Sequence, residues 1–86
     1  MKIQIIGPSA DPVFRDLEAV VLRAMHELGV EATLDEVTAL EEIQKLPLVA
    51  YPAIVIDGRL MCQGHAITLD RAKTCILEAV KLSGSA

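Results

Sequence analysis

Aromatic side chains are almost missing from this sequence, whose 86 residues include one phenylalanine, one tyrosine and no tryptophan. So few rings give no surface on which several bases could stack, and twelve acidic residues against eight basic ones repel a polyanion. We therefore expect no nucleic-acid partner. Because hydrophobic residues still make up 52% of the chain, we expect a core of aliphatic side chains and methionine.

Long apolar runs are missing as well. The longest, residues 48–56, is shorter than a membrane-spanning helix requires and is interrupted by Pro52. The chain starts with a strand-like segment over 2–6 and lacks the apolar segment and small-residue cleavage site of a secretory signal. From these features we expect a cytoplasmic protein that does not associate with membranes.

Cysteine is scarce, with only Cys62 and Cys75 in the chain. Two cysteines are too few for a disulfide scaffold or, by themselves, for a structural zinc site, so we expect two reduced thiols. Cys62, His65 and Cys75 could hold a zinc ion with an open fourth position, but this spacing is generic, and we predict no metal site and no cofactor. Cys62 is the candidate for a reactive thiol, because the nearby His65 imidazole could promote its thiolate.

One α/β domain is predicted over residues 1–82, with a flexible tail over 83–86. Its elements follow from runs of β-branched residues, from apolar residues at helical spacing and from the turn signals between them. The expected strands are 2–6, 30–34, 53–56 and 60–62, and the expected helices are 12–28, 39–46 and 69–82.

Capping and turn residues set the ends of these elements. The residues suited to helix N-caps are Asp11, Thr38 and Thr68. Glu41 stands at the capping-box distance from Thr38, and Gly29 is typical of a helix C-terminus. Asp57-Gly58 takes positive φ at little cost and predicts a two-residue hairpin.

The predicted order of elements is β-α-β-α-β-β-α. The first β-α-β unit requires a parallel, right-handed crossover, so its two strands share a sheet and its helix covers one face. The final hairpin adds two antiparallel strands, and the last helix packs beside the first. We therefore expect a four-stranded mixed sheet with helices on both faces.

This order, together with Tyr51-Pro52-Ala53 before the strand 53–56, resembles the thioredoxin fold of small, glutaredoxin-sized thioredoxin-like redox proteins. The resemblance covers residues 1 to about 82 and implies a cis-proline at Pro52 and a C-P-x-C motif at the start of the first helix. In this chain the matching segment is 11–14, with Asp11 and Phe14 in place of the two cysteines. An ungapped alignment uses Ala10 and Val13 instead. Either way no sulfur is present there, so the usual thiol-disulfide exchange cannot occur at this position.

Two of the matching residues have more than one interpretation. As an N-cap, Asp11 contributes about 1 kcal/mol to helix stability. Its charge at the positive end of the helix dipole could also interact with a partner. Pro52 shapes the entry to a buried strand. The resemblance also implies that the backbone of Tyr51 is free to pair with an extended peptide or with glutathione.

Two functions remain open from the sequence. The first is a binding or scaffold module without catalytic residues, whose partner is a protein, an extended peptide or a second copy of the chain. Its predicted binding residues are Pro8, Asp11, Pro12, Phe14, Tyr51 and Pro52. The second is a divergent thiol-disulfide oxidoreductase acting through Cys62, or a variant of an active protein whose paired cysteines were removed.

Overall fold

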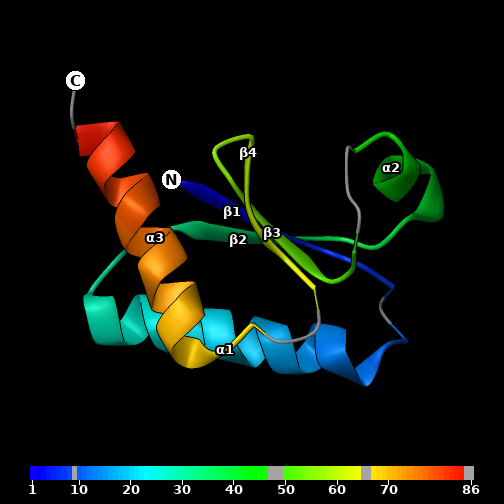
Figure 1. The fold of residues 1–86 in the computed structure, drawn as a ribbon, viewed down its shortest axis with the longest axis horizontal. Coiled ribbons are helices and arrows are strands. Elements are labelled where there is room, and N and C mark those ends of the chain that lie inside the picture. Colours follow the sequence, from blue (N-terminus) through cyan, green and yellow to red (C-terminus); the bar gives the residue numbers. More distant parts are fainter. Residues whose placement is uncertain (9, 47–49, 65–66, 85–86) are drawn as a thin grey trace.

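Strands and helices alternate along the chain in the predicted order (Figure 1). The computed structural model describes residues 1–8, 10–46, 50–64 and 67–84. Its elements are β1 (Lys2–Ile6), α1 (Pro12–Leu28), β2 (Thr33–Val37), α2 (Leu40–Gln44), β3 (Ala53–Ile56), β4 (Arg59–Gln63) and α3 (Leu69–Gly84).

The four strands form one mixed sheet in the order β2-β1-β3-β4. β1 runs parallel to β2, as the connection through α1 requires, and antiparallel to β3. Asp57 and Gly58, both at positive φ, join β3 and β4 as an antiparallel hairpin. The expected four-stranded mixed α/β architecture is therefore confirmed.

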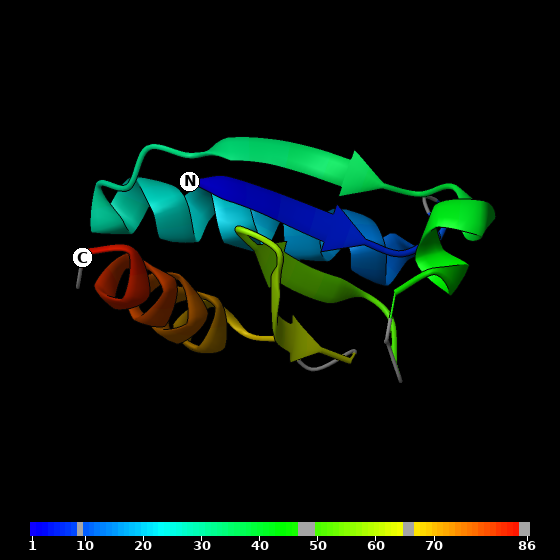
Figure 2. The same ribbon diagram turned by 90° about the horizontal axis from the view of Figure 1, so that it is seen from above.

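Alternate residues of the central strands divide the core between the two faces of the sheet. Ile3 of β1 and Ile54 of β3 point to the face that α1 and α3 cover, and Ile6 and Val55 point to the other face. Figure 2 shows α1 and α3 on one side and α2 at the end of the sheet far from α3. On this second face Ile43 is the buried anchor of α2.

β2 begins at Thr33, three residues later than predicted. The reason lies in the end of α1, where Gly29 has a φ of 66° and the Val30 N–H donates to the Met25 carbonyl at 3.0 Å. Val30 is therefore committed to the helix cap and cannot pair with β1. Sheet pairing starts where the Thr33 N–H donates to the Met1 carbonyl, 3.0 Å away.

α2 starts differently from the prediction and is shorter. Its N-cap is Ala39, and no side chain caps it, so the predicted capping box of Thr38 and Glu41 is wrong. Ala39 is exposed, whereas Ile43 is buried. A helix of one turn has little stability of its own, so its position depends on tertiary contacts such as those of Ile43.

α3 begins as predicted, since the Thr68 hydroxyl accepts a hydrogen bond from the Arg71 N–H at 3.2 Å. The helix continues to Gly84, so residues 83 and 84 belong to it and not to the predicted tail, whereas 85 and 86 lie outside the described residues. Val80 is exposed. No helix in the described ranges combines the length and the apolar character that a membrane crossing needs.

Candidate functional site

The Tyr51–Pro52 peptide bond, immediately before β3, is cis. Pro52 is buried, and its carbonyl accepts a hydrogen bond from the Gly64 N–H at 2.9 Å. On the other side of Tyr51, the Ala50 N–H donates to the Gln63 side-chain oxygen Oε1 at 3.2 Å. Two consecutive residues at the end of β4 therefore hold the chain just before and just after Tyr51.

Tyr51 itself sits between these two attachments and is partly exposed. Among the residues that the structure describes, neither its N–H nor its C=O takes a backbone partner. An unpaired N–H and C=O beside a strand is the arrangement to which an extended chain adds by main-chain hydrogen bonds. The structure thus positions at Tyr51 the backbone groups that a peptide strand would need.

The start of α1 is built as the sequence predicts. Asp11 is the N-cap, and its carboxylate oxygen Oδ1 accepts a hydrogen bond from the Val13 N–H at 3.0 Å. The Asp11 N–H donates to the Pro8 carbonyl at 3.1 Å, and Pro12 occupies the first turn, where a missing N–H costs nothing. Pro8 and Pro12 are exposed, so they are available at the surface.

Phe14 does not contribute to that surface, although the sequence placed it among the binding residues. Its ring is only 2% exposed and belongs to the core between the sheet and α1. A side chain at Gly7 would meet this ring at 3.2 Å and the Pro52 Cα at 3.5 Å. Gly7 therefore lies close to both Phe14 and Pro52, and the buried Phe14 ring is part of the core and not of a ligand-binding surface.

A hollow of about 140 Å³ lies beside the cis-proline. Its lining residues come from the first half of α1, from Pro52 and from the connection between β4 and α3: Val13, Asp16, Leu17, Val20, Pro52, Gly64 and Ile67. Sequence reasoning missed Gly64, Ile67 and the α1 residues of this set. The available signal was Gly64, whose φ of 110° suits glycine and marks a close backbone approach at the end of a strand.

Cys62 and Cys75 form a disulfide in this structure, so the expectation of two reduced thiols is wrong. The two residues are 4% and 5% exposed and lie in the core that α1 and α3 cover. Cys62 pairs across the hairpin with Ile54, and Ile54 lies two residues after Pro52 in the chain. His65, predicted to promote a thiolate, lies outside the described residues. Within the described part of the chain, no three His, Cys, Asp or Glu side chains converge as metal ligands.

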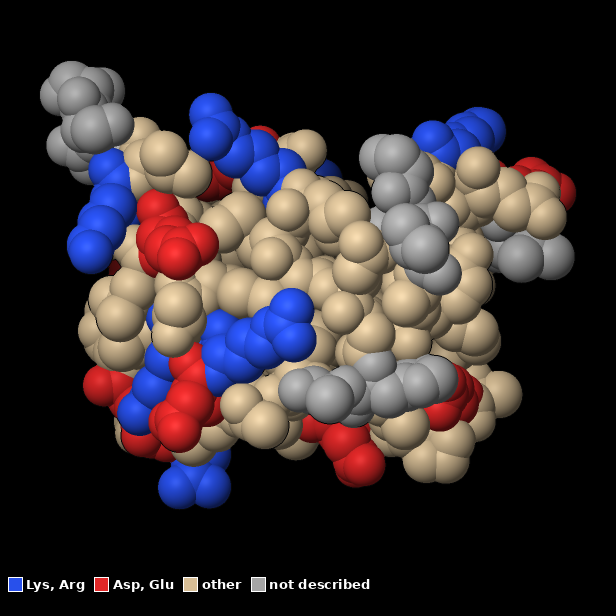
Figure 3. Space-filling model, in the orientation of Figure 1, with Lys and Arg blue, Asp and Glu red and all other residues tan. Residues whose placement is uncertain are grey.

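A cluster of ion pairs joins α1 and α3. Glu27 of α1 accepts from Lys73 Nζ of α3 at 2.7 Å and from Arg23 Nε at 2.8 Å, and these two cations lower the pKa of Glu27. Figure 3 shows mixed charges gathered over α1 and α3, whereas the surface over the middle of the sheet is mostly uncharged. The ion pair between Glu27 and Lys73 attaches α3 to α1.

One acidic pair lies on the far side of α1, beside β2. A hydrogen bond between the side chains of Glu18 and Glu36 raises the pKa of Glu18, and slight burial and repulsion from Glu36 add to this, whereas Arg15 opposes it. These three residues and Phe14 line a small hollow of about 80 Å³. Glu18 is partly exposed and Glu36 is exposed.

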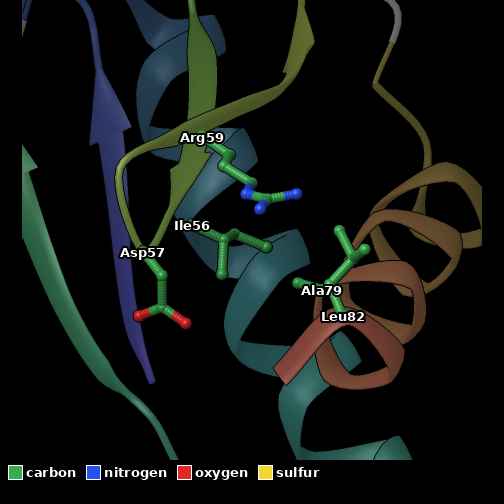
Figure 4. A pocket seen from close by; sticks show the side chains of 5 residues that line it. All are labelled: Ile56, Asp57, Arg59, Ala79 and Leu82. Carbon is green, nitrogen blue, oxygen red and sulfur yellow. The ribbon is translucent and has the colours of Figure 1, made fainter. Parts of the chain in front are cut away.

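A larger hollow, about 220 Å³, lies at the other end of the β3–β4 hairpin. Figure 4 shows Ile56, Asp57 and Arg59 of the hairpin on one side and Ala79 and Leu82 of α3 on the other. None of the predicted binding residues lines it. The cis-proline site is therefore the better candidate, because the predicted Pro52 lines a hollow there and the backbone of the adjacent Tyr51 is unpaired.

Comparison with known proteins agrees with this geometry. Residues 1–77 match the family model described as Thioredoxin domain. The chain is also 30% identical over 73 residues to a protein named Thioredoxin from Methanothermobacter thermautotrophicus (strain Delta H), a match that covers 85% of this chain and 94% of that protein. No solved structure matches the chain significantly.

Proposed function

The chain belongs to the thioredoxin domain family, and we propose that it binds an extended peptide segment of a partner protein at the cis-proline loop, without thiol exchange at the start of α1. The observation that carries this proposal is the unpaired backbone of Tyr51, held from both sides by Gln63 and Gly64. A peptide strand laid along Tyr51 would exchange main-chain hydrogen bonds with it.

The lost sulfur pair favours binding over catalysis. In the alignment with one extra turn residue, Asp11 stands at the place of the attacking cysteine and uses its carboxylate to cap α1, and Phe14 stands at the place of the resolving one with a buried ring. The ungapped alignment puts Ala10 and Val13 at these places. None of these four side chains can form a mixed disulfide. A partner held at Tyr51 would therefore be bound and released without covalent chemistry at α1.

The hollow beside Pro52 suggests which peptides bind. Val13, Leu17 and Ile67 give it apolar walls that suit one aliphatic side chain of the peptide. Asp16 on its rim and the half-buried Asp11 at the helix start favour a neighbouring basic residue over an acidic one. We place the protein in the cytoplasm, where a partner protein would present such a segment.

A charge placed in the hollow tests the proposal. The Val13→Glu variant is expected to bind a selected peptide at least about tenfold more weakly, because a carboxylate would enter an apolar contact. The peptide is first chosen from an array of short cysteine-free sequences probed with the unchanged protein. Its affinity for each variant is then measured by fluorescence anisotropy, and amide chemical shifts locate the bound peptide.

Leu22→Glu is the matched control for this experiment. It introduces the same charge on α1, at an exposed leucine outside the hollow, and should leave the affinity within about twofold. An array without any binder, or a peptide whose chemical shifts fall away from Tyr51, Gly64 and Ile67, would contradict the proposed function.

The disulfide favours a second candidate function, thiol-disulfide exchange through Cys62 and Cys75. In that reaction the bonded pair accepts two electrons from a dithiol, which leaves as a disulfide, and the two cysteines become thiols. We expect insulin reduction with dithiothreitol to run at the same rate with the unchanged protein and with the double variant Cys62→Ser/Cys75→Ser. If the unchanged protein reduces insulin catalytically and the double variant does not, thiol-disulfide exchange is the function and the binding proposal is rejected.

A further inference from the structure

The disulfide encloses the segment that holds the cis-proline loop in place. It joins Cys62 in β4 to Cys75 in α3, with a sequence separation of 13. Inside this closed loop lie Gln63 and Gly64, whose hydrogen bonds reach Ala50 and Pro52 on either side of Tyr51. The same loop carries Ile67, which lines the hollow next to Pro52. One wall of the peptide site is thus part of a covalently closed ring.

We propose that this disulfide is a redox control of the peptide site. When Cys62 and Cys75 are bonded, Gln63, Gly64 and Ile67 are held against the cis-proline loop and Tyr51 is fixed for a peptide. When the bond is reduced, this wall loosens and the peptide binds more weakly. The proposal rests on the proposed function of the site, and the experiments separate a failure of peptide binding from a failure of redox control.

The chemical step is an ordinary two-electron reduction by a dithiol. One thiolate of the reductant attacks a sulfur of the disulfide, the bond between Cys62 and Cys75 breaks, and a mixed disulfide forms. The second thiol of the reductant displaces the remaining cysteine and closes the reductant's own disulfide. Both protons end on the two cysteines as thiols. Disulfides in a thiol-rich cytoplasm are typically transient, as a control element requires.

Reduction should loosen the wall without releasing the helix. α3 is anchored separately by Ala72 and Ile76, which are fully buried, and by the ion pair of Lys73 with Glu27. Between β4 and α3, Gly64 attaches to Pro52 by a backbone hydrogen bond. Opening the ring restores chain freedom mainly to Gln63, Gly64 and Ile67. A structural crosslink alone would alter overall stability but would not act selectively on Tyr51.

Amide hydrogen exchange of the full chain, with and without dithiothreitol, tests the proposal before any ligand is involved. Thiol titration should count no free thiols before reduction and two after. We expect reduction to speed exchange of the Gly64 N–H at least about tenfold and to leave the amide of Val21, in the buried face of α1, unchanged. The double variant Cys62→Ala/Cys75→Ala keeps small apolar groups in the core and should match the reduced protein under both conditions.

The array-selected peptide provides the second readout, with an expected loss of affinity of about tenfold on reduction and no redox response in the double alanine variant. Two free thiols in the air-oxidised protein, equal Gly64 exchange in both states, or equal acceleration at Gly64 and Val21 would overturn the control. If the exchange rate of the Gly64 amide depends on the redox state but no peptide binds in either state, the proposed function is overturned. A peptide bound equally in both states, with Gly64 unchanged, would overturn only the redox control.

Discussion

Replacing Phe14 by alanine is expected to lower the free energy of unfolding by about 3–4 kcal/mol. The ring is almost fully buried and lies against Gly7 next to the buried Pro52. The tight backbone turn at Gly7 and the proline ring cannot move far into the space that the missing ring would leave, so a cavity would remain. Urea unfolding followed by circular dichroism measures the change.

Leu22→Ala is the comparison for this variant, because Leu22 is an apolar residue of the same helix that is 48% exposed. Its truncation should change the free energy of unfolding by no more than about 0.5 kcal/mol. A loss of less than about 1 kcal/mol for Phe14→Ala, comparable to that of Leu22→Ala, would show that the ring is not packed under the cis-proline. Phe14 would then be a candidate surface binding residue, as the sequence predicted.

Placing cysteines at positions 11 and 14 is expected to raise disulfide reductase activity well above that of the unchanged chain. A thiolate at position 11 would take the place of the carboxylate that now accepts the Val13 N–H at the positive end of α1, where a thiol pKa is lowered. The thiol at position 14, buried and one helical turn on, would resolve the mixed disulfide. Insulin reduction driven by dithiothreitol should rise at least about tenfold above the parent rate.

Two further variants interpret the result. Asp11→Cys alone should form a mixed disulfide but turn over slowly, because no second thiol resolves it. The pair Ala10→Cys/Val13→Cys tests the ungapped alignment, which places the thiols at an exposed turn residue and at a residue of the hollow. A folded Asp11→Cys/Phe14→Cys protein without activity, beside an active Ala10→Cys/Val13→Cys protein, would show that the ungapped alignment is the correct one.

Local signals in the sequence predicted the ends of α1 well. Asp11 and Gly29 act within a few residues of themselves, by capping the first and last turns of the helix, so their effect can be read without knowledge of the fold. The hairpin at Asp57-Gly58 belongs to the same class. The start of β2 was less predictable, because Val30 has high strand propensity but its N–H is taken by the end of α1.

The candidate site was only partly predictable, because it depends on contacts between segments that are distant in the sequence. The hydrogen bonds of Gln63 and Gly64 to the cis-proline loop join segments more than ten residues apart, and no periodicity or spacing announces them. The pairing of Cys62 with Cys75 likewise depends on how α3 settles against β4. Phe14 shows the same limit, since an aromatic residue at the edge of a helical apolar stripe is compatible with burial or with a binding surface until the neighbouring loop is placed.

Tyr51 is the single tyrosine of a chain that has no tryptophan, and it stands partly exposed at the cis-proline loop. The ultraviolet emission of the unlabelled protein therefore originates almost entirely from one ring at the candidate site. Quenching of this emission by an added compound would report an event at that one position of the molecule. A screen for ligands of the site needs neither an attached dye nor an introduced chromophore.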